Sequence, residues 1–196
     1  GWTFFPNAME VINSGSQQTD QQELLRDWFG LLNHGHSVTP VGSSDSHDVS
    51  RFIVGQTRTY IRCNDHDPAN IDLQEALRNF VDGSVLVSFG LLTEIEINDA
   101  YGPGGLVPGS DEVKISVKVS GPSWTNAEKV SLYVNGKKVR EAVITDGGRA
   151  GEKWSGDWFL TVPSQDIHLV AVAEGPAQRL PYWPVAKPYQ ASSPDW

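Results

Sequence analysis

The 196-residue chain has little cysteine, little positive charge and no long hydrophobic run, and each shortage excludes a class of protein. Its single cysteine, Cys63, cannot form an internal disulfide, so the sequence leaves the cellular compartment open. The formal net charge of minus 9 argues against a nucleic-acid-binding surface, which needs clustered basic residues. Because no run approaches the roughly eighteen apolar residues that span a bilayer, and no leader is evident before Trp2, we expect no membrane partner either.

The first half of the chain alternates strand-like and helix-like segments. Apolar residues recur at the spacing of one helical face over residues 20–35, where Thr19 or Asp20 would cap the helix and Gly35 would end it. A second helix is predicted over residues 71–81. This alternation is typical of an α/β fold.

The stretch VTPVGSSDSH at residues 38–47 carries the strongest chemical signal. A short apolar strand ends there in small residues and is followed by Asp45 and His47, with one residue between them. The carboxyl ends of strands in α/β layers are where such folds place their chemistry. A carboxylate and an imidazole form part of a ligand shell for zinc, manganese or iron, although a hydrogen-bonded turn or a helix cap is the alternative interpretation.

Five segments in order extend this signal over residues 8–99: AMEVINS, DQQELLRDWFGLLNHG, VTPVGSSDSH, GQTRTYIRC and LQEALRNFVDGSVLVSFGLLTEIEIND. Together they resemble the last part of a metallohydrolase of the polymerase and histidinol phosphatase (PHP) superfamily, in its CehA/McbA-like branch. The resemblance implies a distorted β/α barrel that binds divalent cations and hydrolyses phosphate esters or related bonds. It also places Asp45 and His47 on that family's last metal-binding motif.

The remaining metal ligands of that family belong to motifs upstream of the matched region. Two protein ligands fall short of the three that a hydrolytic metal site usually has. We therefore expect residues 1–97 to be the C-terminal part of a PHP-like barrel from a larger enzyme, inactive alone. Zinc, manganese or iron and a small ester or phosphoester substrate would bind to the intact parent, whereas this fragment alone could hold no metal. The incomplete barrel could self-associate.

Several other polar residues invite a functional interpretation. Arg58 follows the metal motif and could bind an anionic oxygen of the substrate, with a structural salt bridge as the alternative. Glu10 is predicted to be a strand-end carboxylate held by backbone donors. His34 and His36 flank Gly35, where contact with solvent or with the helix C-terminus is favoured over metal binding.

Two further segments have a structural interpretation. Cys63 lies in a predicted strand and is interpreted as a buried, inert thiol. The acidic loop at residues 64–67 lacks the spacing of a calcium loop, and a solvated turn before the next helix is favoured.

The pattern changes near Asn98. The Gly- and Pro-rich stretch at 98–110 predicts a domain boundary, although the strand at 92–98 could belong to the second unit. Beyond it, residues 112–119 alternate apolar and polar side chains, and Asn135 with Gly136 predicts a hairpin turn. With further strands at 158–162 and 167–173, we expect residues 98–196 to form an immunoglobulin-like β-sandwich with a Pro-rich tail.

The second half is also rich in aromatic residues, which supports a different function: Trp124, Trp154, Trp158, Tyr182, Trp183 and Trp196. Exposed tryptophans on one flat face would indicate a non-catalytic module that binds carbohydrate or protein, supported by the α/β part. Core packing is the favoured explanation. Secretion of the parent is suggested only by analogy with exported enzymes that carry such sandwiches.

Overall fold

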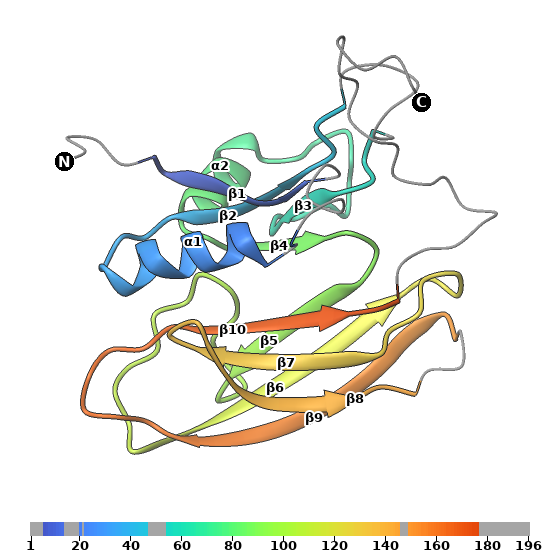
Figure 1. Ribbon diagram of the computed structural model, residues 1–196. Helices are drawn as coiled ribbons and strands as arrows, with labels where there is room; N and C mark the ends of the chain where they lie inside the picture. The colour runs from blue at the N-terminus through green and yellow to red at the C-terminus, as the bar shows by residue number, and fades with distance from the viewer. Residues whose placement is uncertain (1–5, 14–19, 21, 47–53, 146–148, 177–196) are drawn as a thin grey trace, which may run out of the picture.

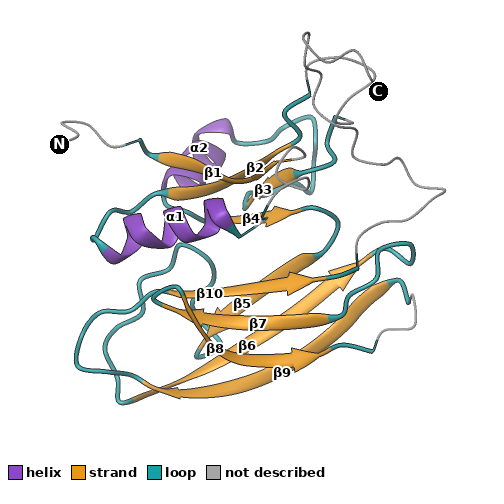
Figure 2. Ribbon diagram, in the orientation of Figure 1, coloured by secondary structure: helices purple, strands orange, loops and turns teal. Residues whose placement is uncertain are grey.

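A computed structural model of the protein describes residues 6–13, 20, 22–46, 54–145 and 149–176. Over these residues the fold is mostly β-strand with few helices, and its strands form four small sheets and no closed barrel (Figure 2). The described residues up to Ser88 form an α/β unit, and the strands from Leu92 to Glu174 form two facing sheets, which we call the sandwich (Figure 1). No helix in the described ranges is long and apolar enough to cross a bilayer.

The α/β unit begins with two parallel strands joined through a helix. Strand β1 (Ala8–Asn13) pairs with β2 (Thr39–Ser43), and α1 (Glu23–Asn33) connects them. Helix α1 buries Trp28 and Phe29, and the Trp28 indole N–H donates a hydrogen bond to the Val38 carbonyl at 2.8 Å. The helix is thereby fixed to the strand that it precedes.

Both ends of α1 can be traced to local chemistry. The helix begins one turn later than predicted, because the Asp20 carboxylate accepts hydrogen bonds from the Gln22 backbone and the Arg26 side chain instead of capping the helix. Thr19, the other predicted cap, lies outside the described residues. Gly35, with φ of 78°, takes the left-handed conformation that ends the helix, as predicted.

The second part of the α/β unit is an antiparallel pair, β3 (Arg58–Ile61) with β4 (Val85–Ser88), and α2 (Leu73–Val81) lies between them in sequence. Asp72 caps α2 by accepting hydrogen bonds from the backbone of Gln74 and Glu75. These hydrogen bonds to its charged form lower the pKa of Asp72.

Strand β2 meets β3 and β4 through a close approach at Gly42. The Thr59 hydroxyl accepts a hydrogen bond from the Gly42 N–H and donates one to the Gly42 carbonyl, both at 2.9 Å. A Cβ atom at position 42 would lie 2.6 Å from Val87 Cγ1 and 2.9 Å from the Arg58 carbonyl oxygen. The absence of a side chain at Gly42 therefore allows the two strand pairs to meet.

The sandwich consists of two antiparallel, three-stranded sheets. One has the order β5-β6-β9 and the other β10-β7-β8 (Figure 1). The bounds of these strands are β5 (Leu92–Ile97), β6 (Glu112–Gly121), β7 (Lys129–Val134), β8 (Lys137–Val143), β9 (Gly151–Thr161) and β10 (Leu169–Glu174). Because β5 pairs with β6 along its whole length, this strand belongs with the sandwich and precedes the Gly- and Pro-rich stretch at which the boundary was predicted.

The core of the sandwich is formed by inward side chains of both sheets. Alternate residues of β6 are 4 % exposed or less: Val113, Ile115, Val117 and Val119. They pack with Val130 and Leu132 of β7. Asn135 and Gly136 have φ angles of 50° and 77° and connect β7 to β8, which confirms the predicted hairpin.

Replacing Gly42 should destabilise the protein, because the added Cβ would collide with Val87 and with the Arg58 backbone. We expect Gly42→Ala to lower the free energy of unfolding by about 1–3 kcal/mol, measured by urea denaturation. Gly30→Ala is the matched control, since a Cβ there meets nothing within 4 Å and alanine favours a helix. Equal midpoints for the two variants would contradict this explanation of Gly42.

Candidate functional site

The predicted metal edge is formed where β1 and β2 end side by side. The parallel register sets Asn13 beside Ser43. Glu10 joins both strand ends, because its carboxylate accepts one hydrogen bond from the Ser43 hydroxyl and another, of 2.8 Å, from the Asn13 side chain. Side-chain donors therefore hold this carboxylate. The prediction that backbone donors hold it was wrong.

Asp45 lies two residues beyond the end of β2. Its side chain is exposed, and its φ of 51° is in the left-handed region, which aspartate tolerates better than most residues. Nearby, the Ser46 hydroxyl donates a hydrogen bond to the Ser44 hydroxyl at 3.1 Å. His47, the predicted partner of Asp45, lies outside the described residues, so their approach to one cation stays a prediction.

The donor chemistry at this edge fits part of a divalent-metal shell. Asp45 offers hard oxygen ligands, and such oxygens suit zinc, manganese or iron when imidazoles complete the shell. Within the described ranges, no group of three or more His, Cys, Asp or Glu residues could hold a metal ion. A complete site would need His47 and further ligands.

Arg58 begins β3, and its backbone lies beside Gly42 near the end of β2. The side chain is exposed, and its guanidinium carbon lies 5.8 Å from the centre of the Tyr60 ring, within the range of a cation–π contact. Gly42, which lies against the Arg58 backbone, is three residues before Asp45 in the sequence. The predicted role in binding a substrate anion and the alternative salt bridge both remain predictions.

Three other features named in the sequence analysis lie within the described residues. His34 Nδ1 lies 2.7 Å from the Gly30 carbonyl oxygen, so this imidazole contacts the C-terminal turn of α1, as predicted. Cys63 is half-buried, which is less than expected. In the acidic loop, Asp67 accepts hydrogen bonds from the Asn70 side chain and the Ala69 backbone, which lower its pKa and close a local turn.

The tryptophans that the structure describes do not share an exposed face. Trp28 is buried, and Trp154 and Trp158 pack together against the sandwich core with ring centroids 5.4 Å apart. Trp124 is 60 % exposed. The other aromatic residues of the carbohydrate-binding hypothesis, Tyr182, Trp183 and Trp196, lie outside the described residues. The described part of the chain therefore gives that alternative no support.

The α/β unit and the sandwich contact each other through residues that no sequence motif indicated, and we call this contact the joint. Phe29 of α1 contacts Tyr133 of β7 and His168, with ring centroids 5.6 and 5.8 Å apart. The Asn33 side chain donates a hydrogen bond of 3.3 Å to the Asn135 carbonyl. A Cβ at Gly136 would lie 3.0 Å from Phe29 Cβ, so the hairpin turn fits closely against the helix.

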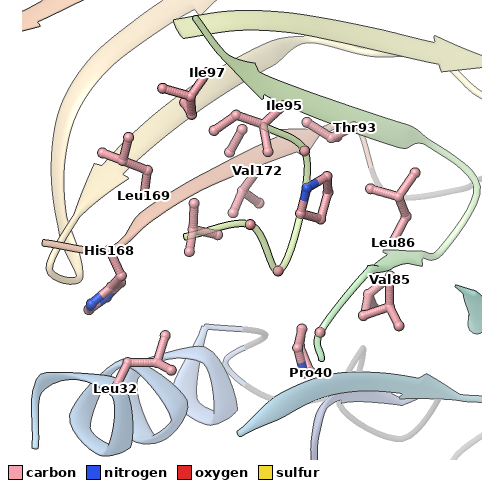
Figure 3. A pocket seen from close by; sticks show the side chains of 18 of the residues that line it. Leu32, Pro40, Val85, Leu86, Thr93, Ile95, Ile97, His168, Leu169 and Val172 are labelled. Carbon is pink, nitrogen blue, oxygen red and sulfur yellow. The ribbon is translucent and has the colours of Figure 1, made fainter. Parts of the chain in front are cut away.

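Beside this joint lies an apolar cleft of about 2090 Å³ between the two units, lined among others by Leu32, Pro40, Val85, Ile95 and Leu169. Figure 3 shows these side chains directed into the space, with His168 at one end. The His168 Nε2 atom is buried without a hydrogen-bond partner in the described structure, and burial lowers the pKa of this imidazole.

Comparisons of the chain with protein-family models, with curated proteins and with solved structures found no match.

Replacing Phe29 should weaken the joint. We expect Phe29→Ala to reduce the free energy of unfolding by about 3–5 kcal/mol, because a buried aromatic ring in contact with both units is removed. Phe159→Ala is the matched control, since Phe159 is 58 % exposed and its loss should cost about 0.5 kcal/mol or less. Urea denaturation measures both, and similar losses would contradict the assigned role of Phe29.

The stability of the joint should also depend on pH. The folded pKa of His168 is lower than that of the unfolded chain, so the stability it contributes is present above the unfolded value near 6.5 and is lost as the pH falls toward the folded value. Thermal melts at pH 7.5 and pH 5.5 should differ less for His168→Phe than for the unaltered protein. His66→Phe, at an exposed position, should keep the full difference. An unchanged difference in His168→Phe would contradict this assignment.

Proposed function

We propose that this chain is the C-terminal part of a metal-dependent hydrolase of the PHP superfamily, in the CehA/McbA-like branch. The observation that carries the proposal is the parallel β1-α1-β2 arrangement, whose strands end side by side just before Asp45 and His47. The order of the five resembling segments supports the same assignment. The substrate class would be small molecules with an ester, amide or phosphoester bond.

The same proposal includes a barrel and an appended sandwich. The two strand pairs β1-β2 and β3-β4 would be the last strands of an incomplete β/α barrel, with α1 and α2 as its helices. The two antiparallel sheets that follow would form an immunoglobulin-like sandwich appended to the barrel. Within the described residues neither strand pair is extended by a third strand, which supports self-association or association with the remaining barrel strands.

Each residue at the strand ends would have a defined role. Asp45 and His47 would hold a divalent cation, which supplies Lewis-acid chemistry for hydrolysis when bound. Glu10 would position the site, because its hydrogen bonds to Ser43 and Asn13 hold the two strand ends together. Arg58, whose backbone lies beside β2, would bind an anionic oxygen of the substrate.

These residues would form an incomplete catalytic site. Asp45 and His47 are two ligands, and hydrolytic metal sites usually have at least three from the protein. We therefore propose that the 196 residues bind a divalent cation weakly and do not hydrolyse esters alone. Metal-dependent esterase activity of the isolated chain would contradict the proposal that the remaining metal ligands lie outside these 196 residues.

The metal assignment can be tested by titrating Mn²⁺ into the purified chain and measuring bound metal by electron paramagnetic resonance. We expect Asp45→Ala and His47→Ala each to weaken binding at least about tenfold, because each removes one ligand. Asp65→Ala and His66→Ala are matched controls from an exposed loop and should bind as the unaltered chain does. Equal Mn²⁺ affinity across all four variants, or no Mn²⁺ binding by the unaltered chain, would overturn the assignment.

A further inference from the structure

Helix α2 carries three exposed aliphatic side chains in line. Leu73, Leu77 and Val81, which we call the apolar row, are 70, 57 and 51 % exposed. Because these positions are four residues apart, they follow one side of the helix. We propose that residues 1–5, GWTFF, pack on the apolar row through the side chains of Trp2 and Phe4. This inference does not depend on the proposed hydrolase.

The contact of α2 with its own strand pair leaves the apolar row uncovered. A different side of the helix packs on β3, where the Asn79 side chain donates a hydrogen bond of 2.7 Å to the Arg62 carbonyl. Glu75, Ala76 and Phe80 of that side are half-buried, and no residue of α2 is fully buried. Single exposed apolar side chains are common on proteins, whereas three in line form a continuous patch that a further segment can cover.

The start of β1 lies beside the end of α2 that carries Val81. The Thr39 backbone N–H donates a hydrogen bond of 2.9 Å to the Asn7 carbonyl, and the Thr39 hydroxyl donates one of 2.8 Å to the Phe80 carbonyl. Thr39 therefore connects the residue before β1 to the last turn of the helix. The chain also bends at Asn7, so residues 1–5 need not continue along the line of β1.

The length and period of residues 1–5 match the apolar row. Five extended residues span about 17 Å, whereas Val81 and Leu77 are only about 6 Å apart along the helix axis. Trp2 and Phe4 are two residues apart, so in an extended segment they share one face with a spacing of about 6.6 Å. Phe4 can thus lie on Val81 while Trp2 lies on Leu77.

The chemistry of the two surfaces favours this segment over a second copy of the chain. Residues 1–5 contain no ionisable side chain, so their packing buries no charge. A stable interface between two proteins buries about 800 Å² on each partner, which is more than three aliphatic side chains supply. A segment joined directly to β1 needs far less contact, because the covalent connection gives it a high effective concentration at the row.

Disulfide formation in the full chain tests the contact. In a Cys63→Ser background, Trp2→Cys is combined with Leu77→Cys, and Phe4→Cys with Val81→Cys, so each pair keeps one of the two aromatic residues. With oxidised glutathione, each pair should form an intramolecular disulfide at least about tenfold faster than Trp2→Cys with Phe159→Cys. Phe159 is the matched control, because it is 58 % exposed but lies on β9 of the sandwich.

Mass spectrometry and non-reducing electrophoresis separate the outcomes. Rates in both pairs no faster than in the control would overturn the proposal. Disulfides that link two chains, with none formed within a chain, would assign the apolar row to a second copy and would also overturn it.

Urea denaturation measures the same contact without cysteines. Trp2→Ala should lower the urea midpoint by about 0.5 M, because the exposed row loses its aromatic cover. Thr3→Ala, on the opposite face of an extended segment, should leave the midpoint unchanged. In a Leu77→Ala background the loss caused by Trp2→Ala should fall by at least half. Equal losses in the two backgrounds, or no loss from Trp2→Ala, would overturn the proposal.

Discussion

The contacts of helix α1 are the constraint on which the arrangement of this protein depends. Two consecutive aromatic residues face different partners, because the Trp28 indole is hydrogen-bonded to the chain just before β2 while the Phe29 ring reaches Tyr133 and His168. Both residues are buried, and both contribute to one apolar cluster. The helix therefore contacts the chain before β2 and the sandwich at the same time.

The parallel pairing of β1 and β2 has a chemical consequence as well as a structural one. Parallel strands bring residues from distant parts of the sequence to the same edge, so Asn13 and Ser43 become neighbours. Glu10 then connects them through its carboxylate. Asp45, two residues beyond β2, takes a left-handed conformation at the position where the proposed metal motif begins.

Patterns that depend on near neighbours were predicted well from the sequence. The alternation of β6, the Asn135 and Gly136 turn and the end of α1 at Gly35 follow from side-chain period and from backbone conformations that few residues favour. The start of α1 was predicted too early, because the Asp20 carboxylate bonds to the Gln22 backbone and the Arg26 side chain and does not cap the helix. Strand β9 is longer than predicted, since Gly156 and Asp157 resemble turn residues but pair with β6.

The candidate sites differ in how much the sequence could reveal. Asp45 could be proposed as a site residue from a local sequence pattern, whereas the hydrogen bond between Ser43 and Glu10 depends on strand pairing. His168 was not predicted as a functional residue at all. Its significance arises from contact with Phe29, which lies far away in the sequence, and from an unpaired ring nitrogen that only the packed structure defines.

The double hydrogen bond between Thr59 and Gly42 has an evolutionary implication. A single hydroxyl is bonded to both backbone groups of one residue, so it sets the alignment of β2 against β3 without a regular ladder between them. The alignment is thus independent of how many residues separate the two positions along the chain. Insertions or deletions between them could accumulate in descendants of this protein while the strand ends, and any ligand held there, keep their places.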